Sequence, residues 1–413
     1  MKNLSESNTY NRYTLSNGIR IIHKYTDSPV AHLGITIDAG SRDEKPYENG
    51  IAHFIEHCIF KGTATKPYCR ILSRIDGVGG ELNAYTTKEE TVVYATFLTS
   101  YYERAAELLC DITFNSIFPE KELEKEKSVV IDEINSYEDS PSELIYDEFE
   151  QLVFGRTGLG RMILGTQDKV SGFNGAMIRD FIQRNWFTDR MVISTVGNID
   201  FDKFVRLVQK YFSKVPAKLS ADKRRTTYHY YPKHAVKNRD TYQAHVMIGN
   251  ICYSYRNNKY IAFSLLNNIL GSNAMNSVLN MHIREKYGNT YAIESSYTAY
   301  RDSGIFQVYA GCETHFAEKI TQLIVKELET FANKRITQSL LTRGKQQLKG
   351  QLAIQYDSNQ NEMLSIGKAL LNFDKAATIE ETFRQIDEVS ANDISEVAGE
   401  IFVADKLSSI IYI

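Results

Sequence analysis

The sequence predicts an α+β protein of two duplicated α/β sandwich domains, each about 200 residues long with a mainly antiparallel sheet packed by helices. Its 413 residues suffice for two or three domains at roughly 150 residues each. Strand-like and helix-like segments alternate without a strict strand–helix–strand rhythm, which favours a sandwich over a doubly wound sheet. A weak internal repeat indicates that this order of elements occurs twice.

The evidence for the repeat is a set of short sequence matches that occur in the same order in both halves. They pair Ala31–Leu33 with Ala244–Val246, Phe60–Thr63 with Ile269–Ser272, Gly79 with Gly288, and Asp139–Ser140 with Asp357–Ser358. Between the halves, residues 214–240 hold eight Lys or Arg against two Asp and show no periodicity. We therefore predict a first domain over 1–213, a linker over 214–240 and a second domain over 241–413.

Each element of the first half has a local signal. Apolar residues alternate at Leu33, Ile35 and Ile37, which predicts a half-buried strand. Pro119 is suited to the first turn of a helix, and acidic residues follow it. The predicted elements are strands at 18–23 and 31–39, a helix from about Gly50, helices at 103–114 and 119–137, a strand at 191–197 and a helix at 201–212.

Composition excludes several classes of protein. Forty-eight basic residues nearly balance 51 acidic ones, so bulk charge does not predict nucleic-acid binding. The basic run Lys223–Arg225 is interpreted as a solvated linker face. No stretch approaches the roughly 18 apolar residues of a membrane span, and the polar start lacks the apolar core of a signal peptide. Five scattered cysteines without a CxxC pair predict reduced thiols and a cytoplasmic location.

One helical segment carries the chemistry. His53, Glu56 and His57 stand at i, i+3 and i+4, so on a helix they share one face. Two imidazoles one turn apart can bind one zinc ion, and the carboxylate between them can reach a zinc-bound water. The order His-x-x-Glu-His is the inverzincin motif. The alternative is a helix that merely carries two histidines and a glutamate. Cys58 is interpreted as a packing residue.

A catalytic zinc site needs a third protein ligand. Glu126 and Glu133, on the predicted helix 119–137, are candidates. They are seven residues apart, so they share a face and lie roughly 10 Å apart along the axis. Acidic residues on helices are usually exposed to solvent. Spacing alone therefore does not choose between the two glutamates.

Several motifs together resemble the pitrilysin/insulinase-type zinc peptidases, most closely their short bacterial branch, which is similar to mitochondrial processing peptidase. The resemblance covers nearly the whole chain. It rests on Gly40–Glu44, Gly50–Thr63, Gly79–Thr86, Glu126–Ile134, Ile163–Gly165, Val196–Asn198 and Arg284–Tyr291.

The resemblance implies a role for each matching residue. His53, His57 and Glu133 would bind one zinc ion per chain, and Glu56 would be the general base. Glu126 would orient a ligand imidazole through a hydrogen bond.

When the second half is matched to the first through the internal repeat, it has no metal site of its own. Ala262 and Leu266 stand opposite the two histidines, and Gln351 stands opposite Glu133.

The segment after Gly79 is predicted to bind substrate. Taken alone, it is an ordinary strand after a glycine turn. The resemblance makes it an edge strand, where a peptide adds by backbone pairing along Gly80, Leu82, Asn83 and Ala84. The same resemblance implies that Arg284 and Tyr291 are the residues that the second domain contributes to the active site, where they would hydrogen-bond the substrate carbonyl. From sequence alone, Arg284 is a surface residue and Tyr291 begins an alternating strand.

These observations predict a zinc-dependent endopeptidase acting on short or unfolded peptides. Relatives with one pair of such domains generally dimerise, so a homodimer is predicted, without a nucleic-acid or membrane partner. The alternative is a metal-free structural or peptide-binding subunit of the same fold. Such chains typically lack one or more of the site residues, all of which are present here.

Overall fold

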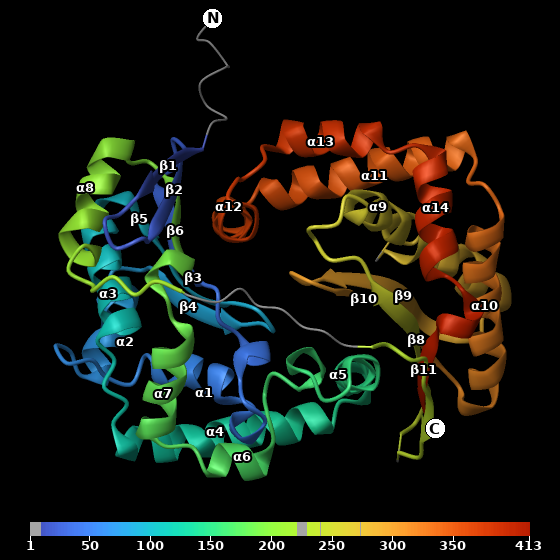
Figure 1. The fold of residues 1–413 in the computed structure, drawn as a ribbon, viewed down its shortest axis with the longest axis horizontal. Helices are drawn as coiled ribbons and strands as arrows, with labels where there is room; N and C mark the ends of the chain where they lie inside the picture. Colours follow the sequence, from blue (N-terminus) through green and yellow to red (C-terminus); the bar gives the residue numbers. More distant parts are fainter. Residues whose placement is uncertain (1–9, 221–228, 240, 273) are drawn as a thin grey trace, which may run out of the picture. The chain divides into compact units, whose positions relative to one another are not determined.

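The computed structural model describes residues 10–220, 229–239, 241–272 and 274–413 (Figure 1). They form two compact units. Unit 1 takes its described residues from the ranges 1–134, 162–223 and 354–378, and unit 2 takes them from 135–161, 224–353 and 379–413. The units are thus interleaved along the sequence, whereas the predicted domains are contiguous. Segments 135–161 and 354–378 each pack in the unit formed mainly by the other half.

Unit 1 contains a six-stranded sheet in the order β1-β2-β6-β3-β5-β4. Its strands are β1 (Asn11–Thr14), β2 (Arg20–Tyr25), β3 (Val30–Ile37), β4 (Glu81–Thr86), β5 (Thr91–Leu98) and β6 (Met191–Gly197). Only β2 and β6 pair in parallel. The substrate-binding strand predicted from sequence, β4, lies at one edge.

Unit 2 contains a five-stranded sheet with the same topology, in the order β7-β11-β8-β10-β9. Its strands are β7 (His234–Lys237), β8 (Ala244–Cys252), β9 (Thr290–Ala299), β10 (Gly304–Cys312) and β11 (Ser408–Tyr412). The parallel pair β7–β11 corresponds to β2–β6, and the edge strand β9 corresponds to β4. The predicted fold class, two similar sandwiches with mainly antiparallel sheets, is confirmed.

Helices cover both sheets. In chain order they are α1 (Ile51–Cys58), α2 (Tyr68–Asp76), α3 (Tyr102–Phe114), α4 (Glu120–Glu138), α5 (Pro141–Phe154), α6 (Gln167–Ser171), α7 (Gly175–Asn185), α8 (Phe201–Phe212), α9 (Tyr260–Gly271), α10 (Ala317–Asn333), α11 (Gln338–Tyr356), α12 (Asn359–Phe373), α13 (Ile379–Glu388) and α14 (Ala391–Ile401). The apolar sides of α1, α3 and α8 join one core with the sheet of unit 1. Those of α9, α10 and α14 do the same in unit 2. No described helix is both long enough and apolar enough to cross a bilayer.

Each half of the sequence contributes one helix to the unit formed mainly by the other half. From the second half of the chain, α12 packs on β3 and β6 of unit 1, while α5 from the first half packs on β8 and β11 of unit 2. Met363 on α12 lies against Gly34 of β3, where a Cβ would come 2.8 Å from its sulfur. The prediction that β3 is half-buried is therefore wrong, because all but its first residue are buried and helices cover both faces.

The stretch predicted as a linker contains one strand that the sequence analysis missed. Within it, β7 pairs in parallel with β11. The basic run Lys223–Arg225 lies outside the described residues. The boundaries at 213 and 241 stay a prediction.

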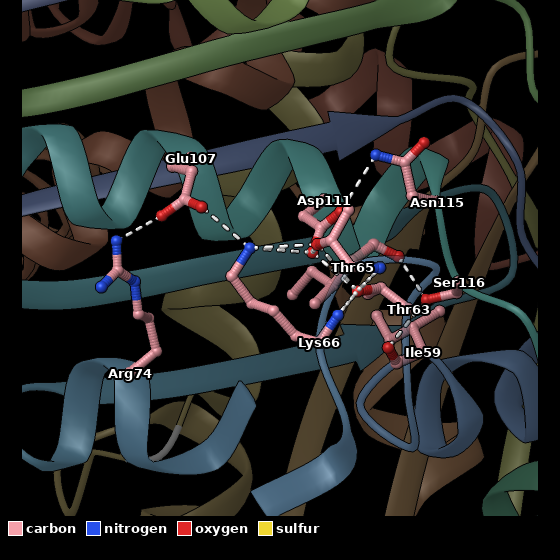
Figure 2. A network of polar contacts seen from close by, with 10 residues as sticks. Ile59, Thr63, Thr65, Lys66, Arg74, Glu107, Asp111, Asn115 and Ser116 are labelled. Carbon is pink, nitrogen blue, oxygen red and sulfur yellow. Dashed lines mark hydrogen bonds and ion pairs between the residues drawn. The ribbon is translucent and has the colours of Figure 1, made fainter. Parts of the chain in front are cut away.

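A polar network holds the loop that follows α1 against α3 (Figure 2). The Oδ2 of Asp111 on α3 accepts hydrogen bonds from the Oγ1 atoms of Thr63 and Thr65, each at 2.7 Å. The Nζ of Lys66 lies 3.2 Å from the same oxygen, and Nδ2 of Asn115 donates to Oδ1 at 3.0 Å. Burial alone would raise the pKa of the Asp111 carboxyl, but these hydrogen bonds outweigh it and lower the pKa. The ionised carboxylate therefore stabilises this loop.

Asp111→Asn is expected to lower the free energy of unfolding by about 2–3 kcal/mol at neutral pH, the scale of a hydrogen bond to a buried charge. A carboxyl group whose pKa is lowered by folding stabilises the protein at pH values above about 3.9, the pKa of that group in the unfolded chain. This stabilisation is lost as the pH falls through the lower pKa of the folded state. The difference from the native protein should therefore shrink in acid. Urea denaturation at neutral pH and at about pH 3.5 measures it, with the exposed Asp76→Asn as control. An equal loss at both pH values would contradict a role for the charge.

Candidate active site

Two helices of unit 1 bring the predicted metal ligands together. His53 and His57 on α1 and Glu133 on α4 offer ligand atoms that all lie within 4.8 Å of one another. The Oε2 of Glu133 lies 3.7 Å from Nε2 of His53 and 3.5 Å from Nε2 of His57. His53 is buried, His57 is half-buried and Glu133 is exposed. Both imidazoles thus turn their Nε2 atoms to one carboxylate oxygen.

The packing of α1 sets this orientation. Ile51, Phe54, Ile55 and Cys58 are buried in the core of unit 1. The two histidines therefore lie on the side of the helix that faces α4. Burial also raises the pKa of the Cys58 thiol well above its usual range, which suits a packing residue and disfavours a thiolate nucleophile.

Burial and ion pairs set the charges at this cluster. Burial, with the nearby imidazole of His57, lowers the pKa of His53 to about 3, so His53 is neutral, as a metal ligand must be. Burial alone would lower the pKa of His57, but its hydrogen bond to Glu126 and the charges of Glu133 and Glu56 outweigh it and raise the pKa.

The second glutamate of α4 faces the other nitrogen of His57. The Nδ1 of His57 lies 3.4 Å from Oε2 of Glu126, a buried carboxylate. The Nζ of Lys61 lies 2.6 Å from Oε1 of the same group. Burial would raise the pKa of Glu126, but the hydrogen bonds from His57 and Lys61 lower it. Sequence reasoning missed Lys61, although a basic residue four positions after His57 was a usable signal.

Glu56 lies on α1 between the two histidines. It is half-buried next to Thr86, the last residue of β4. Burial raises the pKa of Glu56, and Thr86 and His57 offset this only in part. A carboxylate with a raised pKa is a better proton acceptor near neutral pH.

The predicted substrate strand lies beside this helix, since α1 contacts β4. Along β4, Leu82 and Ala84 are half-buried and Asn83 is exposed. Gly80, just before the strand, has no room for a side chain, because a Cβ would lie 2.6 Å from the carbonyl oxygen of Thr96. Among the described strands, β4 pairs only with β5 and so forms one edge of the sheet.

Arg284 and Tyr291 belong to unit 2, whereas the histidine–glutamate cluster belongs to unit 1. Arg284 lies in a π-helix, Asn280–Glu285, and its Nη1 donates to Oδ1 of Asn280 at 3.3 Å. Tyr291 lies on the edge strand β9 and is 61% exposed. Their predicted contact with substrate stays a prediction.

The corresponding helices of unit 2 lack metal-ligating side chains at the matching positions. Ala262 and Leu266 on α9 are buried in the apolar core, and Gln351 lies on α11. In the described part of the chain, the group of His53, His57 and Glu133 is the only set of three potential ligands found together.

Two family models match successive stretches of the chain. The family model described as "Insulinase (Peptidase family M16)" matches residues 20–167, and the one described as "Peptidase M16 inactive domain" matches residues 172–348. The Bacillus subtilis protein YmxG is 35% identical over 402 residues, 97% of each chain. The Mycobacterium leprae protein ML0855 is 33% identical, over 94% of this chain and 88% of its own. Both are described as uncharacterized zinc proteases.

Solved structures share the fold at low identity. A protease from Helicobacter pylori has a TM-score of 0.90 at 21% identity, covering 98% of this chain and 99% of its own. A protein from Pseudomonas fluorescens, described as a peptidase M16 inactive domain, has a TM-score of 0.91 at 18% identity, over 98% and 97%. The sequence matches and the shared fold agree with the resemblance noted from the motifs. The chain therefore belongs to the insulinase family of peptidases, family M16.

Proposed function

We propose that the protein is a zinc-dependent endopeptidase that hydrolyses short or unfolded peptides with a metal-activated water. One observation carries the proposal: a nitrogen of each of two imidazoles and a carboxylate oxygen lie within 4.8 Å of one another. Two histidines and a glutamate are a ligand set of catalytic zinc sites. Family membership and relatives named as zinc proteases support the same activity.

His53, His57 and Glu133 would hold one zinc ion per chain. Zinc bound there would lower the pKa of a water ligand towards about 7 and would polarise the scissile carbonyl. Glu56 takes the proton of the attacking water and passes it to the leaving amine. Glu126 accepts a hydrogen bond from Nδ1 of His57 and so leaves Nε2 free to bind metal.

The edge strand β4 would bind the substrate backbone. Leu82, Asn83 and Ala84 would pair with an extended peptide as an added strand. Backbone pairing tolerates many side chains, but it requires an extended chain. Short or unfolded peptides are therefore the proposed substrates.

The second unit would complete the site, with Arg284 and Tyr291 donating to the substrate carbonyl. The proposal includes a homodimer and a cytoplasmic location. The five unpaired cysteines, of which only Cys69 is exposed, are in keeping with that location. A metal-free subunit of the same fold is the alternative. Protein purified without chelator distinguishes the two, since a chain that neither carries nor takes up zinc would be the subunit.

Glu133→Gln is expected to weaken zinc binding by more than about 100-fold, above the range for a residue that only orients a ligand. The amide replaces an anionic donor with a neutral one. Glu126→Gln is the matched comparison and should cost about 10–100-fold. Competition with a chromogenic chelator measures both. If Glu126→Gln strips the metal and Glu133→Gln does not, the two roles are reversed.

A further inference from the structure

The segment Gly40–Glu44 has no part in the function proposed so far, yet it contacts the start of α1. Glu44 is only 4% exposed. Its Oε2 accepts hydrogen bonds from the backbone N–H of Gly50 and from Nδ2 of Asn49, both at 2.9 Å. Its Oε1 accepts from the backbone N–H of Ala52 at 3.0 Å. All these donors lie at or next to the first turn of the helix that carries the proposed zinc ligands.

This helix needs such an acceptor from outside. The first N–H groups of any helix have no partner within it, and α1 is only eight residues long. Its N-cap residue, Gly50, has no side chain to accept them, and its first turn holds no acidic residue. A buried carboxylate there satisfies the N–H groups and matches the positive end of the helix dipole. His53 is the third residue of the helix and lies in this same turn.

The other end of the segment is fixed to the residues after β4. The backbone N–H of Ser41 donates to the carbonyl of Thr87 at 3.1 Å, and that of Arg42 donates to Lys88 at 2.8 Å. Gly40 approaches so closely that a Cβ would lie 2.4 Å from the Thr87 carbonyl oxygen. The segment therefore links the end of the substrate strand to the first turn of α1.

We infer that Glu44 is a positioning residue for zinc binding: it fixes the first turn of α1, and with it the imidazole of His53, relative to β4. The inference rests on the proposed function, in which His53 binds zinc. Glu44 does not touch the metal. It acts by holding the backbone from which His53 projects.

A double-mutant cycle on zinc affinity tests this role. Glu44→Gln keeps the shape but puts an amide donor where N–H groups need an acceptor, and it should weaken zinc binding by about 10–100-fold. If Glu44 acts through His53, His53→Ala should then cost less in the Glu44→Gln protein than in the native protein. Chelator competition gives all four affinities without any activity assay.

Glu148→Gln is the matched control. Glu148 in unit 2 is held by three side chains, Lys237 at 2.8 Å, Arg239 at 2.7 Å and Tyr412 at 2.5 Å. Glu148→Gln should leave zinc affinity unchanged. His53→Ala should weaken zinc binding as much in the Glu148→Gln protein as in the native protein. If Glu44→Gln fails to fold, Glu44→Asp, which keeps the charge on a shorter side chain, is used in the same cycle and should show a smaller effect of the same sign.

The outcomes separate the two proposals. Native zinc affinity in folded Glu44→Gln, or an undiminished cost of His53→Ala in that background, would overturn the role of Glu44 and leave the zinc site intact. If His53→Ala alone does not weaken zinc binding, the zinc site itself is wrong and the role of Glu44 is overturned with it.

Discussion

Glu56→Gln is expected to lower peptide hydrolysis by about 10²–10⁴-fold, the contribution of a general base. The amide keeps the shape of the side chain between His53 and His57 but cannot accept the proton of the attacking water. Because Glu56 is not among the clustered ligand atoms, zinc should remain bound. Turnover of a quenched peptide, measured beside zinc content, checks both parts.

The same chemical change at an exposed site of unit 1 is the control. Glu103→Gln on α3 alters a carboxylate that pairs with Lys210 on the surface, and turnover should be unchanged. Near-normal turnover of zinc-loaded Glu56→Gln would remove Glu56 from the role of base.

Arg284→Ala or Tyr291→Phe is expected to lower turnover by up to about 10³-fold, the range for losing one donor to a developing oxyanion. Zinc would stabilise that charge from one side, and a guanidinium or phenol would stabilise it from another. Both residues belong to unit 2, and neither is one of the three clustered ligands, so zinc affinity should not change. Parallel measurement of turnover and zinc content checks the prediction, and loss of zinc in either variant would contradict it.

Mixing two inactive variants shows which chain supplies the pair. If Arg284 acts across the proposed dimer, combining Glu56→Gln with Arg284→Ala protein should restore part of the activity, because a mixed dimer then holds one intact site. No recovery, in mixtures shown to exchange subunits, would mean that each chain completes its own site.

Local patterns were enough to predict the helix with His53, Glu56 and His57, because three polar residues at i, i+3 and i+4 share a face whatever the rest of the fold does. They were not enough to separate Glu126 from Glu133, which share a face of α4. Their different positions along α4 separate them, because Glu133 lies near the Nε2 atoms of both histidines and Glu126 lies near Nδ1 of His57. That information is tertiary, and only the resemblance to a family supplied it in advance.

Long-range contacts account for what the sequence did not reveal. The sequence predicted a half-buried β3 because the alternating apolar residues of this strand form only the face that packs on helices from the same half of the chain. The second face of β3 is covered by α12, more than 300 residues later, and small residues such as Gly34 make room for it. Glu44 was noticed only as part of a motif, since no spacing rule links it to the N–H of Ala52 eight residues on.

The position of α12 has a consequence for how the chain is made. The last strand of the first sheet, β6, ends at Gly197, but α12 ends only at Phe373. At about 5–20 residues per second, the ribosome needs roughly 10–35 s to make the intervening chain. During that time Ile22, Val192 and Val196, which α12 later covers, present an apolar surface to solvent or a chaperone. A gene fragment ending after β6 would encode that sheet without its cover, and its product should aggregate where the full chain stays in solution.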